Sequence, residues 1–131
     1  MLKAQSPLLD DDEKLIHNTI GCCIAVHREL GPGLPESLYS RALCIEFHEN
    51  GLAFEREQPC PVIYRGEHLS EYRLDFVVAD EIVLEIKSVE MIAEVHHSQL
   101  IHYLRLSRRR VGLLVNFNVS VLRNGIVSKV L

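Results

Sequence analysis

The segment that most constrains the fold of this chain is RLDFVVADEIVLEIKSVE, residues 73–90. Its apolar runs on either side of a short polar break predict two strands joined by a tight turn. Asp75, Glu85 and Lys87 nevertheless interrupt the apolar residues that a buried strand pair requires. Charged side chains are seldom buried without a partner or a metal ion. The segment therefore predicts either a solvated face or a built site.

The length of the turn decides which side chains face each other across this hairpin. A three-residue loop at residues 79–81 sets Asp75 opposite Glu85, whereas a two-residue loop would set Leu74 there. We predict the three-residue loop. Two adjacent carboxylates repel each other, a divalent cation relieves the repulsion, and oxygen ligands favour magnesium or manganese over zinc.

Lys87 adds an ammonium group to this pair of acids. Such a group can position a water or stabilise the charge that develops on a phosphate. Together the three side chains are the minimum set for metal-assisted phosphodiester hydrolysis. The alternative is a surface hairpin with a cross-strand ion pair, which contributes little to stability.

Length and composition are typical of a single globular domain, expected over residues 1–131 with a loose segment at residues 1–10. The chain has 131 residues, 47% of them apolar, which is enough for a core without disulfides. A net charge of -4 argues against a wholly basic surface but not against a local basic groove. Four cysteines without CxxC spacing favour free thiols. With no membrane-spanning run or signal peptide, a cytoplasmic location without a membrane partner is expected.

Apolar periodicity and turn residues predict the order α-α-β-β-β-α-β-β, a mixed sheet flanked by helices in an α/β fold. The helices are expected at residues 10–30, 35–50 and 92–107, and the strands at residues 54–65, 67–78, 82–87, 110–117 and 126–131. Pro59 and Pro61 make the first strand an edge strand or one that starts late. Asn124-Gly125 predicts a hairpin turn before the last strand.

Several motifs occur together and in one order along the chain. GLPESLY at residues 33–39 has the form G-x-x-E-x-x-Y, and LDFVV, LEIKS, QLIHY and VGLLVNF follow it. With these motifs the chain closely resembles the bacterial GxxExxY proteins, which belong to the PD-(D/E)XK nuclease-like superfamily. The resemblance runs from about Ile16 onward. It implies a restriction-endonuclease-like core and a metal-dependent nuclease site.

The resemblance assigns roles to individual residues. Asp75 matches the first acid of the superfamily signature, while Glu85 and Lys87 match its (D/E)-x-K. Glu36 matches the glutamate of the family motif and is expected on the metal, although an acid there also complements a helix dipole. Leu74 stands in place of the proline of the signature, which is dispensable across the superfamily.

Further candidates come from the two predicted helices that flank the motifs. Gln99 and Tyr103 match the Q-x-x-x-Y of the RecB-like branch, which contributes to the active site and DNA contact; the alternative is a helix-to-sheet packing pair. RecB-like nucleases place a helical histidine on the metal, which makes His27 a candidate ligand, and the alternative is a hydrogen-bonded core residue. The expected phosphate contacts in the basic run RLSRRR are Arg105, Arg108 and Arg109, unless they serve only the helix C-terminus.

We therefore expect a Mg²⁺- or Mn²⁺-dependent nuclease, with DNA favoured over RNA. Asp75 and Glu85, with Glu36, would hold the metal, and a metal-bound water would attack the phosphodiester with the help of Lys87. The alternative is a nuclease-fold module of weak or absent activity that binds nucleic acid or a protein partner. A chain of this size has little room for substrate specificity, so a homodimer or a protein partner is an open expectation.

Overall fold

The computed structural model describes residues 10–131, so the segment predicted to be loose lies outside the described residues except for Asp10. Within that range, three α-helices and five strands follow the predicted order, with one added 3-10 helix. In chain order they are α1 (Asp10–Leu30), α2 (Glu36–Glu49), β1 (Phe54–Tyr64), β2 (Glu67–Val78), β3 (Ile82–Lys87), α3 (Glu94–Ser107), β4 (Val111–Asn116), η2 (Leu122–Gly125) and β5 (Ile126–Val130).

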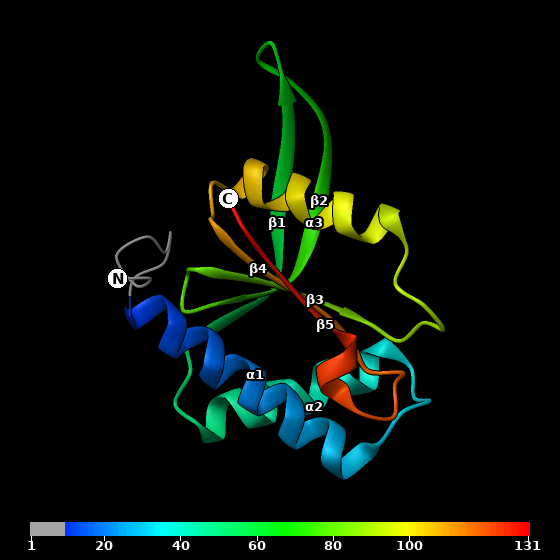
Figure 1. Cartoon of the computed structure of the whole chain (residues 1–131). Helices are drawn as coiled ribbons and strands as arrows, with labels where there is room; N and C mark the ends of the chain where they lie inside the picture. The colour runs from blue at the N-terminus through cyan, green and yellow to red at the C-terminus, as the bar shows by residue number, and fades with distance from the viewer. Residues whose placement is uncertain (1–9) are drawn as a thin grey trace, which may run out of the picture.

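The strands form one mixed sheet in the order β1-β2-β3-β4-β5. Only β3 and β4 are parallel, and α3 makes the crossover between them. Helices α1 and α2 cover one face of the sheet and α3 covers the other (Figure 1). None of the helices in residues 10–131 is long and apolar enough to cross a bilayer. The predicted mixed sheet between helices, with β1 at one edge, is confirmed.

Two apolar cores form because side chains alternate along each strand. Leu84 and Ile86 of β3 point toward α1 and α2, where they pack with residues such as Phe47. Val83, the residue before Leu84, points the other way and packs with Leu100 of α3. Strand β3 is thus buried on both faces, as expected for a central strand beside a parallel neighbour.

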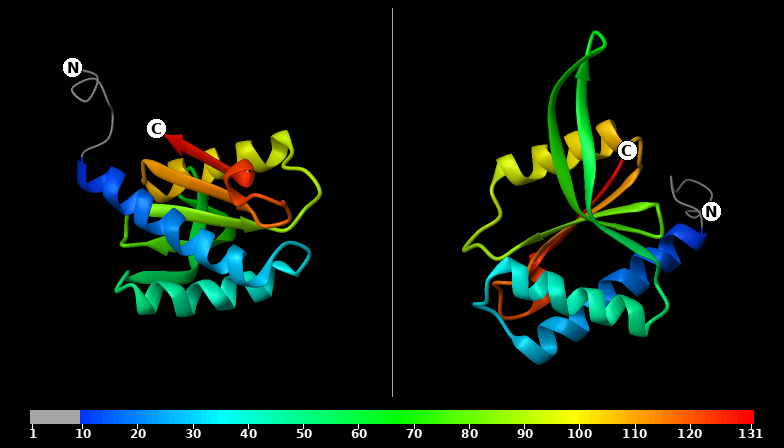
Figure 2. Two further views of the ribbon diagram at one scale, coloured as in Figure 1. Left: turned by 60° about the horizontal axis from the view of Figure 1, so that its bottom comes forward. Right: turned by 180° about the vertical axis from the view of Figure 1, so that it is seen from behind.

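Strands β1 and β2 continue as a two-stranded ribbon beyond the rest of the sheet. Strand β2 pairs with β3 only from Phe76 to Val78, whereas its pairing with β1 runs on to Glu67. We call the part of this ribbon that extends beyond the pairing with β3, residues 58–74, the arm. It passes α3 and projects beyond it (Figures 1 and 2). Arg65 and Gly66 close it in a tight turn with φ values of 50° and 81°.

The prediction of a hairpin turn at Asn124-Gly125 is wrong. Both residues belong to η2, and a longer loop joins the antiparallel strands β4 and β5. A Cβ at position 125 would collide with the carbonyl oxygen of Asn116. Gly125 is therefore required by a close approach to the end of β4 and not by turn geometry.

Candidate active site

The candidate site lies where the sheet splits between β2 and β3. The turn occupies residues 79–81, and Phe76 pairs with Leu84. The next residues in the same register are Asp75 and Glu85, so the predicted three-residue loop is confirmed. Beyond this level β2 follows β1 into the arm and β3 remains paired with β4.

The two carboxylates occupy the split by accepting hydrogen bonds from the opposite strand. The amide of Asp75 donates to Oε2 of Glu85 at 2.9 Å, and the amide of Ile86 donates to Oδ2 of Asp75 at 2.8 Å. Where the strands separate, these amides have no carbonyl of the opposite strand to which they can donate. Because a buried amide requires an acceptor, the carboxylates take that place. One oxygen of each acid is thereby held in place. In residues 10–131 no hydrogen bond engages the second oxygen of either acid.

Burial disfavours the state in which both acids of this pair are ionised. Glu85 is only 4% exposed, and burial, followed by the charge of Asp75, raises its pKa to about 8. Burial likewise raises the pKa of Asp75, against the opposing effects of the Ile86 amide and of Lys87. Without a compensating cation the pair therefore tends to hold a proton near neutral pH.

Lys87 lies two residues after Glu85 on the same side of β3 and is half-buried. Among the described ion pairs, none of 4.0 Å or less joins it to either acid. Its charge still lowers the pKa of both Asp75 and Glu85. The ammonium group is thus near the acids without being neutralised by direct contact.

Glu36 reaches the same end of β3 from the N-terminus of α2. Its Oε2 accepts a hydrogen bond from the amide of Ser88 at 3.3 Å, and the Ser88 hydroxyl donates to the carbonyl of Leu34 at 2.6 Å. The charge of Glu36 raises the pKa of Asp75 and of Glu85. The structure therefore brings this acid within electrostatic range of the pair, and its expected place on the metal stays a prediction.

Tyr39, the tyrosine of the G-x-x-E-x-x-Y motif, holds the loop that delivers Glu36. Its hydroxyl donates to the carbonyl of Gly31 at 2.5 Å and accepts from the amide of Leu34 at 3.1 Å. The ring stacks on Phe117 with centroids 4.4 Å apart. The motif thus joins a positioning tyrosine to the acid that it positions.

The donor chemistry fits a hard divalent cation, although the acids do not form a closed cage. Across residues 10–131, no three His, Cys, Asp or Glu side chains gather closely enough to hold a metal ion. Of the predicted ligands, Asp75 and Glu85 lie together, and Glu36 lies within electrostatic range of them. Mg²⁺ commonly binds one or two carboxylates and keeps several waters, so a two-acid site suits it.

His27 has a hydrogen-bond partner outside this group, and its role as a metal ligand stays a prediction. Its Nε2 lies 2.7 Å from the carbonyl oxygen of Val119, and its ring is 6.2 Å from that of Phe117. The imidazole therefore links α1 to the loop before η2. This is the core role that the apolar stripe of the first helix also allowed.

Tyr103 and Gln99 lie on the face of α3 that borders the pair. Tyr103 is buried, and burial, followed by the charges of Glu85 and Asp75, raises its pKa to about 12. Gln99, one turn earlier, lines a groove together with Tyr103. The structure thus brings Tyr103 toward the acids and places Gln99 beside it.

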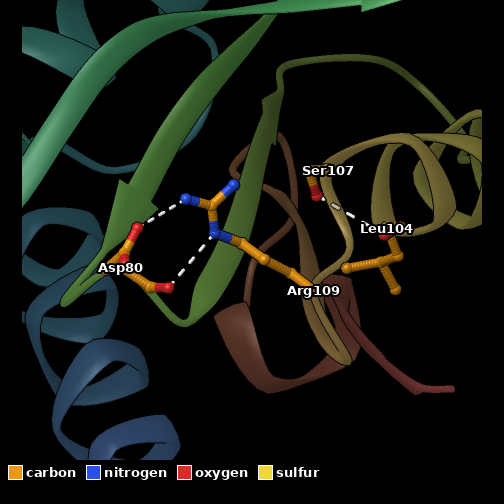
Figure 3. Close-up of polar contacts among 4 residues, drawn as sticks. All are labelled: Asp80, Leu104, Ser107 and Arg109. Carbon is orange, nitrogen blue, oxygen red and sulfur yellow. Dashed lines mark hydrogen bonds and ion pairs between the residues drawn. The ribbon is translucent and has the colours of Figure 1, made fainter.

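The basic run divides between two places. Arg109 donates from Nη2 to Oδ1 of Asp80 at 2.6 Å and from Nε to its carbonyl at 3.2 Å (Figure 3). Asp80 lies in the turn at the opposite end of β3 from Lys87. Arg108, the exposed residue that caps α3, lines a pocket with Asp80 and Arg109, so both arginines lie at the turn end of β3. Their expected phosphate contacts stay a prediction. A crossover helix must return to the start of the next parallel strand. Only Arg105, of the predicted arginines, lines the groove.

Asn116 is a positioning residue that the sequence analysis did not identify. It pairs with Lys87 across β3 and β4 and is buried. Its Oδ1 accepts from the amides of Val89 and Asn118, both at 3.1 Å, and its Nδ2 donates to the Val89 carbonyl at 2.9 Å. Asn116 thus holds the segment that follows Lys87. A polar residue near the end of the apolar run VGLLVNF was the available signal.

Comparison with known proteins identifies one family. A model described as the PD-(D/E)XK nuclease superfamily matches residues 13–129. No curated protein and no solved structure gives a match. The matched span includes every residue of the split sheet described above.

Proposed function

The chain belongs to the PD-(D/E)XK nuclease superfamily, and on that premise we propose that it is a divalent-metal-dependent nuclease that hydrolyses phosphodiester bonds. The observation that carries the proposal is the geometry of Asp75 and Glu85. Each acid is held through one oxygen by an amide of the other strand, and among residues 10–131 no hydrogen bond engages its second oxygen. Lys87 places a positively charged ammonium group near them.

In this proposal Asp75 and Glu85 hold Mg²⁺ or Mn²⁺, and Glu36 is the third acid. When bound, such a cation would lower the pKa of water at the site and stabilise negative charge on the phosphate. Because burial raises the pKa of Glu85, this carboxyl would have to give up its proton to solvent in order to hold a cation. Lys87, on the same side of β3, orients the attacking water or balances the charge on the phosphate oxygens.

The test is cleavage of labelled single-stranded and duplex DNA and RNA with Mg²⁺, Mn²⁺ or EDTA. Asp75→Asn and Lys87→Ala should each lower the rate by roughly 100-fold or more, the scale for losing one group that stabilises transition-state charge. Asp80→Asn is the matched control, because it changes an acid at the other end of β3. Metal-dependent cleavage that survives both site variants would reject the mechanism.

A second candidate function is a nuclease-fold module that binds nucleic acid or a protein without cleaving. It is favoured by one observation, that only two acids gather within the described part of the chain. Such a module would show no stabilisation by Mg²⁺ or Mn²⁺ that disappears in Asp75→Asn. Metal-dependent cleavage would exclude it.

A further inference from the structure

A groove of about 600 Å³ runs between α3 and the arm. In Figures 1 and 2 the arm crosses beside α3 and extends past it. The lining residues come from both elements, so one wall is helix and the other is ribbon. The residues of the groove used here are Val62, Tyr72, Gln99, Tyr103, Arg105 and Leu106.

The walls of the groove combine flat aromatic and apolar surfaces with one cation, Arg105. The rings of Tyr72 and Tyr103 lie 5.4 Å apart at 55°, and Tyr72 is 43% exposed. Val62 and Leu106 add aliphatic surface, while Arg105 adds a positive charge. Aromatic side chains that stack with a base, together with cations for the backbone, are typical of single-stranded nucleic-acid sites.

Tyr103 connects this groove to the candidate active site. It lines the groove, and it also packs in the core beneath α3 with Leu74, the residue before Asp75. Burial raises its pKa most, and the charges of Glu85 and then Asp75 raise it further, as expected for a phenol near the acids. The groove and the split of the sheet are therefore neighbouring sites that share one side chain.

We propose that the groove binds an unpaired nucleobase next to the phosphate that is cleaved, so that single-stranded nucleic acid is the substrate class. The inference rests on the proposed function for the position of the phosphate. A base in a duplex is stacked and paired and cannot enter a groove between a helix and a ribbon without unstacking. An unpaired base leaves a face free to stack on Tyr72.

Binding tested without cleavage isolates the groove from the catalytic site. A fluorescein-labelled oligothymidylate and a duplex of the same length are titrated in EDTA and followed by anisotropy. Tyr72→Ala should weaken binding of the single strand by roughly 5- to 150-fold, the range for loss of one base-stacking contact. Tyr72→Phe should bind as the wild type does, because it keeps the ring.

Tyr64→Ala is the matched control, since Tyr64 is an exposed tyrosine of the arm that does not line the groove. Tyr72→Leu, which keeps an apolar residue in the strand but removes the aromatic face, is the second variant if Tyr72→Ala unfolds. It should weaken binding in the same range. The control should bind the single strand as the wild type does.

The outcomes separate the groove from the nuclease. Loss of single-strand binding in Tyr72→Ala, with no cleavage in any metal, would support the groove and reject the proposed function. Unchanged binding in Tyr72→Ala and Tyr72→Leu, or equal affinity for the duplex, would overturn the groove proposal even if the protein cleaves. Light scattering that shows a dimer converted to monomer by Tyr72→Ala would also overturn it, by assigning the groove to a second copy of the chain.

Discussion

The two faces of the sheet are both buried, but their chemistry differs. Toward α1 and α2 the sheet presents Phe76, Leu84 and Ile86 to an apolar core. Toward α3 it presents Val83 beside Glu85, so a carboxylate lies among apolar neighbours. Strand β3 supplies residues to both faces, since successive side chains alternate. The comparison shows that one strand can carry the core and the candidate site together.

The face toward α1 and α2 contributes stability, whereas the α3 face carries the candidate reactive groups. The face toward α1 and α2 contains a cluster of aromatic rings, including Phe47 and Phe76 at 5.5 Å and 83°. Aromatic burial is a large favourable contribution to folding. On the α3 face the buried acids oppose folding, because desolvation disfavours their charged forms. The apolar face therefore stabilises a fold that tolerates an electrostatically costly site on the other.

The largest effect is expected on the apolar face. Phe47→Ala should lower the free energy of unfolding by about 3–5 kcal/mol, because it opens a cavity in a packed core. The measurement is urea denaturation followed by circular dichroism. Ile45→Ala, in the same helix at 65% exposure, is the control and should change the value by no more than about 0.5 kcal/mol. A loss below about 1 kcal/mol for Phe47→Ala would contradict this account of the apolar face.

The next effect concerns the sign of the pH dependence on the α3 face. Between pH 4.5 and about 8 the folded protein keeps a proton on Glu85 that the unfolded chain has lost. The free energy of unfolding of the metal-free protein should therefore fall as pH rises through this window, and the contribution should be constant above it. Glu85→Gln, which keeps an acceptor for the Asp75 amide, should remove most of that slope.

The expected gain for Glu85→Gln at pH 9 is on the order of a few kcal/mol, since one pKa unit corresponds to about 1.36 kcal/mol. Urea denaturation at pH 5, 7 and 9 in EDTA measures it. The same slope in the variant and in the wild type would show that burial of Glu85 does not govern the pH dependence.

The smallest effect is stabilisation by metal. Mg²⁺ or Mn²⁺ at about ten times its dissociation constant should add about 1.4 kcal/mol to stability, and more affinity is expected at pH 8 than at pH 6 because protons compete for Glu85. Thermal shift with titrated metal measures this. Asp75→Asn should abolish the shift. Asp80→Asn should retain it, since loss of its exposed ion pair with Arg109 changes stability by no more than about 1 kcal/mol. A shift that persists in Asp75→Asn would place the metal elsewhere.

Features that depend on neighbouring residues were predictable from the amino-acid order. The alternation of apolar and polar residues predicted the strands, and the count of turn residues predicted that Asp75 would face Glu85. The two prolines of β1 predicted a sheet edge. Each of these depends on local geometry, in which the side-chain period and the turn length are set over a few residues.

Features that depend on how distant elements meet were not predictable in this way. The sequence did not reveal that Arg109 pairs with Asp80, that His27 meets Val119, or that the arm and α3 form a groove at Tyr72. The crossover of α3 sets which end of β3 receives its C-terminus. The separation of β2 from β3 leaves amides that the acids must satisfy. Residue order specifies the local pieces, whereas packing specifies which ends lie together, because those contacts join segments far apart along the chain.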